Sequence, residues 1–160
     1  MSRSGYSDDC DNLGLWRGAV ASSIKGKRGQ AFLKEALARL DAMPVKELVS
    51  GELEADGQFC TLGVVGAGRG LDLSKIDTYD HEALSGLFDI AGPLAQEIMY
   101  MNDEAVSEGK WVEVEIFGPI RPYEQRRTSI RVPDPVAARR RWQYMRDWID
   151  SNIAAEAVPA

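Results

Sequence analysis

Hydrophobic positions recur at helical spacing in the first third of the chain. In GQAFLKEALARLDAM, residues 29–43, apolar side chains fall at three- and four-residue steps and therefore share one helix face. These positions are Phe32, Leu33, Ala36, Leu37, Leu40 and Met43. A preceding helix is predicted from near Leu13 to Gly26. Pro44 either ends the second helix or begins a short further turn over residues 44–50. The first third is therefore predicted to be a helical hairpin.

The middle of the chain contains shorter apolar segments separated by turn residues. Asp56-Gly57 lies between Leu53 and Phe59 and favours a short hairpin, or a loop that leads into a buried helix at CTLGVVGAG, residues 60–68. LDLSKIDTYD, residues 71–80, has the composition of a loop. Helices are predicted over 81–90 and 91–105.

The spacing changes from helical to alternating near residue 111. Trp111, Val112, Val114 and Ile116 alternate in part with glutamates, which predicts a strand, and TSIRV at 128–132 is a plausible return strand. Glycine and prolines at 118, 119 and 122 exclude a helix between them. The sequence predicts a long hairpin or arm over residues 111–132.

An amphipathic helix is predicted to follow the arm. Asp134 is a plausible N-cap with Pro135 at the first helical position. The apolar stripe comprises Trp142, Met145, Ile149 and Ile153.

These elements predict an α+β fold: one mostly helical domain with a late β-hairpin and a C-terminal amphipathic helix. The globular domain is expected over residues 13–153, with 111–132 as an insertion. Residues 1–12 and 154–160 are expected to be flexible tails.

Composition and charge limit the cellular compartment and the kinds of partner expected for the protein. No apolar run suffices for a membrane span, and the N-terminus has no signal-peptide core. Two cysteines, Cys10 and Cys60, do not make a disulfide framework and indicate a reducing cytoplasm. The net charge of −6 conceals a basic segment, residues 121–146. It contains eight arginines and only two acidic residues, Glu124 and Asp134.

The glycines after Cys60 invite comparison with a dinucleotide-binding loop. Such a loop needs G-x-G-x-x-G between a strand and a long helix, whereas Gly66, Gly68 and Gly70 bring the third glycine one residue early. A polar, broken segment follows instead of a helix. The segment is therefore interpreted as a tightly packed helix or turn, and no cofactor is predicted.

Five short motifs occur in an order that resembles one protein family. They are SGYSDDCDN (4–12), GKRGQAFL (26–33), CTLGVVGAGRG (60–70), MND (101–103) and RWQYMRDWI (141–149). This set resembles a family of small uncharacterised phage and prophage proteins, over most of residues 1–110 and 139–153. The segment from Trp111 to about Val132 departs from the family pattern. The resemblance implies a phage accessory protein in the host-cell cytoplasm, with the arm as the place of a specialised function.

No catalytic or metal site is predicted. His81 is the only histidine and lies at a probable helix start, Cys60 has apolar neighbours, and Cys10 has acidic ones that disfavour a thiolate. Asp8, Asp9 and Asp11 could hold a hard cation but lack EF-hand spacing, and a solvated acidic tail is the preferred interpretation. Glu113 and Glu115 share one strand face, which is usually an outward polar face.

The arginine-rich segment is the strongest candidate binding site. Arginine binds carboxylates and phosphates through two parallel hydrogen bonds and stacks on rings, and aromatic residues lie among these arginines. The predicted partner-binding residues are Arg121, Tyr123, Arg126, Arg127, Arg131, Arg139 and Arg140. Arg141, Arg146, Trp142 and Tyr144 belong to the same segment, and Trp148 follows it. The alternative is that the arginines pair with the protein's own acids and that the tryptophans at 142 and 148 are core residues.

Three functions are compatible with these features. The favoured one is non-enzymatic, stoichiometric binding of a host protein or protein complex, as by an inhibitor of host defence such as an anti-CRISPR protein, with an acidic body that resembles nucleic acid in charge. The second is nucleic-acid binding through residues 121–146. The third is a sponge that holds a small nucleotide in a pocket lined by arginine and aromatic side chains.

Overall fold

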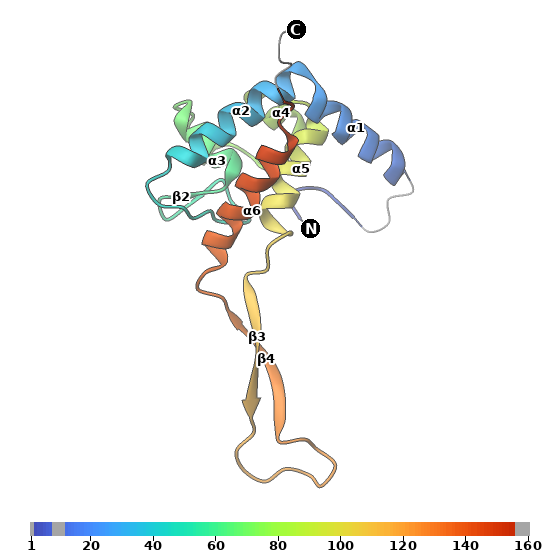
Figure 1. Cartoon of the computed structure of the whole chain (residues 1–160), viewed down its shortest axis with the longest axis vertical. Helices are drawn as coiled ribbons and strands as arrows, with labels where there is room; N and C mark the ends of the chain where they lie inside the picture. The colour runs from blue at the N-terminus through green and yellow to red at the C-terminus, as the bar shows by residue number, and fades with distance from the viewer. Residues whose placement is uncertain (1, 8–11, 156–160) are drawn as a thin grey trace.

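Six α-helices form a body from which a long β-hairpin projects (Figure 1). The computed structural model describes residues 2–7 and 12–155. In these residues the helices are α1 (Leu13–Lys25), α2 (Lys27–Ala42), α3 (Thr61–Gly68), α4 (His81–Phe88), α5 (Gly92–Asp103) and α6 (Ala137–Asn152), with a 3₁₀ turn, η1 (Leu73–Lys75). The strands are β1 (Glu54–Ala55), β2 (Gln58–Phe59), β3 (Gly109–Glu115) and β4 (Arg127–Pro133). The predicted α+β class, mostly helical with a late hairpin and a C-terminal helix, is confirmed.

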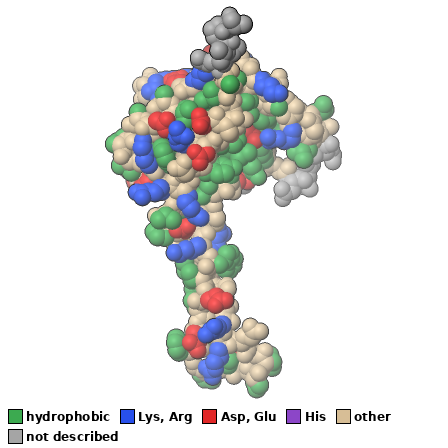
Figure 2. Space-filling model, in the orientation of Figure 1, with side chains coloured by type: hydrophobic (Ala, Val, Ile, Leu, Met, Phe, Trp, Pro, Cys, Tyr) green, Lys and Arg blue, Asp and Glu red, His purple; other side chains and the backbone are tan. Residues whose placement is uncertain are grey.

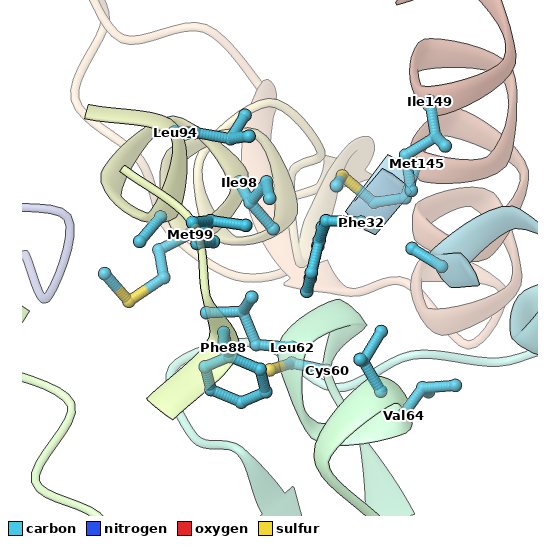
Figure 3. Packing of buried hydrophobic residues seen from close by; sticks show 14 of the residues in the cluster. Phe32, Cys60, Leu62, Val64, Phe88, Leu94, Ile98, Met99, Met145 and Ile149 are labelled. Carbon is cyan, nitrogen blue, oxygen red and sulfur yellow. The ribbon is translucent and has the colours of Figure 1, made fainter. Parts of the chain in front are cut away.

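The core lies where α2 and α5 meet the other helices. α2 packs against α1, α3 and α6, and α5 packs against α1, α3, α4 and α6. Figure 3 shows Phe32, Leu62, Phe88, Ile98 and Met145 in this cluster, and each is at most 2% exposed. Burial of such side chains stabilises each by roughly 1.5–3 kcal/mol relative to exposure.

The apolar stripe of α2 is directed into this core as predicted. Phe32, Leu33, Ala36 and Leu40 are buried, and the helix ends at Ala42, two residues before Pro44. The pattern located this helix correctly because one face is continuously apolar.

α3 contains the glycines that invited comparison with a dinucleotide-binding loop. Residues 61–66 are all buried, and a Cβ on Gly63 would lie 1.9 Å from the carbonyl oxygen of Leu53. Gly66 and Gly68 lie inside this helix rather than in a turn between a strand and a helix. The interpretation as a tightly packed helix is therefore confirmed, and the glycines serve close packing.

The Asp56-Gly57 turn joins β1 to β2 and is followed directly by α3. Asp56 and Gly57 have φ values of 51° and 76°, as in a two-residue hairpin turn. The short hairpin and the buried helix, which the sequence offered as alternatives, therefore occur in succession.

The chain differs from expectation at both ends. Residues 2–7 belong to the predicted tail, but Arg3 and Ser4 are buried, and Gln96 in α5 donates a hydrogen bond to the Ser4 carbonyl. Residues 8–11 and 156–160 lie outside the described residues. Ala154 donates its N–H to Gln30 at 2.7 Å.

The predicted N-cap of the last helix is wrong. α6 begins at Ala137 with Val136 at the N-cap, and no side chain caps it. Asp134 instead accepts the N–H of Val136 and pairs with Arg140 at 2.5 Å. The Asp-Pro pair therefore forms the turn between β4 and α6.

Candidate functional site

The arm is an antiparallel ribbon that leaves and re-enters the body at one place. The register runs from Gly109 opposite Pro133 to Glu115 opposite Arg127. At the base, the Asp134 N–H donates to the Glu108 carbonyl at 2.9 Å, and at the far end Ile116 donates to the Arg126 carbonyl. The predicted hairpin is therefore confirmed.

The register separates the arm into an apolar and a polar face. Residues opposite one another share a face, so Val112 lies beside Ile130 and Val114 beside Thr128, with Val132 next to them. On the other face, Trp111 lies opposite Arg131 and Glu115 opposite Arg127. Glu113 and Glu115 are exposed on this polar face, as the sequence predicted.

The tip of the arm is exposed along nearly its whole length. Every residue from 121 to 131 is exposed, Phe117 is 89% exposed and Tyr123 is 76% exposed. The hydroxyl of Tyr123 accepts a hydrogen bond from Arg121 at 2.9 Å, so these two side chains are placed together. Figure 2 shows basic, acidic and hydrophobic side chains together at this end.

The predicted binding arginines fall into two groups. Among the described residues, the side chains of Arg126, Arg127 and Arg139 make no hydrogen bond or ion pair. Arg131 donates to the Ser107 hydroxyl at 2.8 Å, and Arg140 pairs with Asp134. The unpaired group lies on the arm and on the adjoining first turn of α6.

Arg141 is a structural residue and not part of an exposed basic cluster. It is 1% exposed and donates to the carbonyl oxygens of Asn102 and Leu48, both at 2.8 Å, and to Glu108. A signal was present in the sequence, since Arg141 lies four residues before Met145 on the buried face of α6.

Arg146 and the aromatic residues of α6 also contact the protein itself. Arg146 pairs with Asp41 at 2.9 Å, and that hydrogen bond raises the pKa of Arg146. Trp142 donates to the Leu40 carbonyl at 3.2 Å, and Trp148 packs against the core. For this part of the segment, the alternative interpretation of internal pairing and core anchoring is correct.

The remaining candidate residues have structural surroundings where they are described. His81 Nε2 lies 2.7 Å from the Arg3 carbonyl oxygen, and the buried Cys60 Sγ accepts the Gly63 N–H at 3.4 Å. Cys10, Asp8, Asp9 and Asp11 lie outside the described residues. Within residues 2–7 and 12–155, no group of acidic, histidine or cysteine side chains is arranged to hold a metal ion. None of the helices in these ranges has the length and apolar character needed to cross a bilayer.

Sequence reasoning missed two ion pairs that carboxylates of α5 make with earlier parts of the chain, the first with the N-terminal segment. Arg3 donates twice to Asp103, at 2.6 and 2.9 Å. Burial favours the neutral form of Asp103, but the hydrogen bonds and charge of Arg3 outweigh it, so the pKa of this carboxyl lies below its usual value. Partners so far apart in sequence leave no local pattern.

The second pair joins α1 to α5. Arg17 donates to both oxygens of Glu97, which is 1% exposed and also accepts the Tyr6 hydroxyl at 2.5 Å. Burial and this hydrogen bond raise the pKa of Tyr6, which keeps the phenol neutral.

Comparisons with protein-family models, curated proteins and solved structures found no match to this chain.

Proposed function

We propose that the protein is a non-enzymatic binding protein that engages a host protein stoichiometrically through the hairpin arm. The observation that carries this proposal is the continuous exposure of residues 121–131, next to the exposed ring of Phe117. Tyr, Trp and Arg dominate the energetically important positions of protein interfaces. The arm presents all three types without packing them against the body.

The charge of the arm favours a protein partner over nucleic acid. Glu113, Glu115 and Glu124 are interspersed among its arginines and would repel phosphates. A protein surface can match such a mixed pattern with charges of both signs. The resemblance to phage proteins supports a host protein as the partner and inhibition of a host defence system as the consequence.

Nucleic-acid binding is a second candidate because a two-stranded β-ribbon has the dimensions to enter the major groove. Arg126, Arg127 and Arg139 have no partner in the described part of the chain and would be available for phosphates.

A pull-down from host lysate, with and without nuclease, tests the proposal. The tagged protein is expected to retain one host protein in near-equal amount after nuclease treatment. The double variant Arg126→Glu/Arg127→Glu is expected to lose at least ~10-fold of that binding, because it reverses two unpaired charges at the arm. The control Lys25→Glu/Lys27→Glu makes the same charge change on the body, at the α1–α2 junction, and should bind normally.

Loss of all partners after nuclease would favour the nucleic-acid candidate. Equal retention by the arm variant and the wild type would remove the arm from the interface and overturn the proposal.

A further inference from the structure

A pocket of about 480 Å³ lies between the N-terminal segment, α1 and α5. Three aromatic rings line it, those of Tyr6, Trp16 and Tyr100. The rings of Tyr6 and Trp16 are 5.5 Å apart at 88°, and those of Tyr6 and Tyr100 are 4.9 Å apart at 39°. All three are only partly buried, so the pocket offers ring surface to a ligand.

The cation that lines the pocket is already neutralised. Both terminal nitrogens of Arg17 donate to the buried Glu97, at 2.8 and 2.9 Å. The guanidinium therefore has no free pair of donors for a phosphate. The indole N–H of Trp16 is fully buried and does not reach the open volume.

The remaining polar side chains of the pocket include two acceptors, on Gln96 and Glu104, and the hydroxyls of Ser7 and Tyr100, which can donate or accept. Gln96 uses its amide nitrogen on the Ser4 carbonyl at 2.9 Å, which leaves its amide oxygen without a partner in the described part of the chain. Glu104 is exposed at the rim and accepts serine hydroxyls through one oxygen, Oε1. The pocket thus combines aromatic surface with acceptor oxygens and the carboxylate of Glu104 at its rim.

We propose that this pocket binds an organic ammonium cation, the class in which apolar carbon groups surround a charged nitrogen. Aromatic rings attract such cations through their π-electron faces, and desolvation strengthens the attraction. The carboxylate of Glu104 disfavours a nucleotide, because it would repel the phosphate. The cation is either a free small molecule or a methylated lysine side chain of a protein, and the pocket is separate from the arm.

Isothermal titration calorimetry at constant ionic strength tests the proposal with choline as the probe. We expect saturable binding of choline, and at least ~10-fold weaker binding of 3,3-dimethylbutan-1-ol, which has the same shape without the charge. A trimethyllysine peptide in a parallel titration identifies the source of the cation, according to which ligand binds more tightly. Absence of saturable binding by both cations, equal binding of the neutral analogue, or tighter binding of AMP would overturn the proposal.

Two variants connect the binding to the pocket. Glu104→Gln removes the charge at the rim and is expected to weaken choline binding several-fold, and Tyr100→Leu is expected to weaken it further, with folding checked by the thermal midpoint. Glu113→Gln makes the same change on the arm and should have no effect. Arg126→Glu/Arg127→Glu should also bind choline normally, so failure of the arm proposal does not affect this test. An equal loss in Glu104→Gln and Glu113→Gln would contradict the assignment to the pocket.

Discussion

Arg139 and Arg141 lie two positions apart on α6 and have opposite surroundings. Arg139 is exposed and without a partner among the described residues, whereas Arg141 is 1% exposed and satisfies two backbone carbonyls and a carboxylate. The guanidinium of Arg141 thereby links the end of α5, the segment before β1 and the base of the arm. Identical residue types therefore carry different roles within one turn of helix.

Arg141→Met is expected to destabilise the protein by about 3 kcal/mol. The substitution leaves the carbonyls of Leu48 and Asn102 without their donor in a buried setting. Urea unfolding followed by circular dichroism measures the change. Arg139→Met is the matched control and should alter the free energy of unfolding by less than ~0.5 kcal/mol. Similar values for both variants would contradict the structural role of Arg141.

At the residue scale, the sequence showed where the arginines are concentrated. It indicated only in part which of them are buried and which are exposed. The four-residue spacing from Arg141 to Met145 and Ile149 indicates a buried face, yet an arginine on that face is unusual without partners. Those partners are two carbonyls and Glu108, which come from distant segments. Contacts between distant segments have no signature in local periodicity, which is also why the Arg3–Asp103 pair was missed.

At the scale of elements, the arm lies outside the hydrophobic core of the helical body. The buried cluster and the apolar residues packed on it include none from residues 109–133. A two-stranded ribbon alone is marginally stable, so the arm depends on its own cross-strand pairs and on its base. Period-two alternation predicted the two strands well, and the helix boundaries were predicted to within a few residues. The N-cap of α6 was not predicted correctly, because an aspartate such as Asp134 suits a turn as well as a helix cap.

Replacement of residues 110–132 by Asn-Gly is expected to leave the body folded. Because the arm contributes no side chain to the core, the thermal midpoint should change by less than ~3 °C. Differential scanning calorimetry measures it. Met145→Ala serves as the positive control, since its truncation in the core is expected to cost about 2–5 kcal/mol. A drop of ~10 °C or more in the deletion variant would show that the arm supports the body.

At the scale of the whole molecule, carboxylates with lowered pKa values couple stability to pH. Hydrogen bonds from Arg69 lower the pKa of Glu35, with a further contribution from Arg39, and Arg3 lowers that of Asp103 against the effect of burial. Such groups bind protons more weakly in the folded state than in the unfolded state. They therefore stabilise the fold above their unfolded pKa values, which are 3.8 for Asp103 and 4.5 for Glu35, and this contribution is lost as the pH falls through the folded values.

Acid unfolding should therefore depend on Arg3. The free energy of unfolding is expected to be nearly constant from about pH 7 to 5 and to fall below about pH 4. Arg3→Gln should be less stable than the wild type at pH 7, and the difference should shrink below about pH 4 as Asp103 becomes protonated. Urea titrations at several pH values measure it. The control Arg28→Gln breaks an exposed pair with Asp89 and should leave the profile unchanged. A pH-independent difference for Arg3→Gln would contradict the coupling.

The closed base of the arm, where the Asp134 N–H meets the Glu108 carbonyl, also bears on how such a molecule evolves. The chain departs and returns at neighbouring points, so a segment of another length or sequence can be exchanged there without a change to any core residue. Under the binding function proposed for the arm, its target can then change while the helical body keeps its sequence.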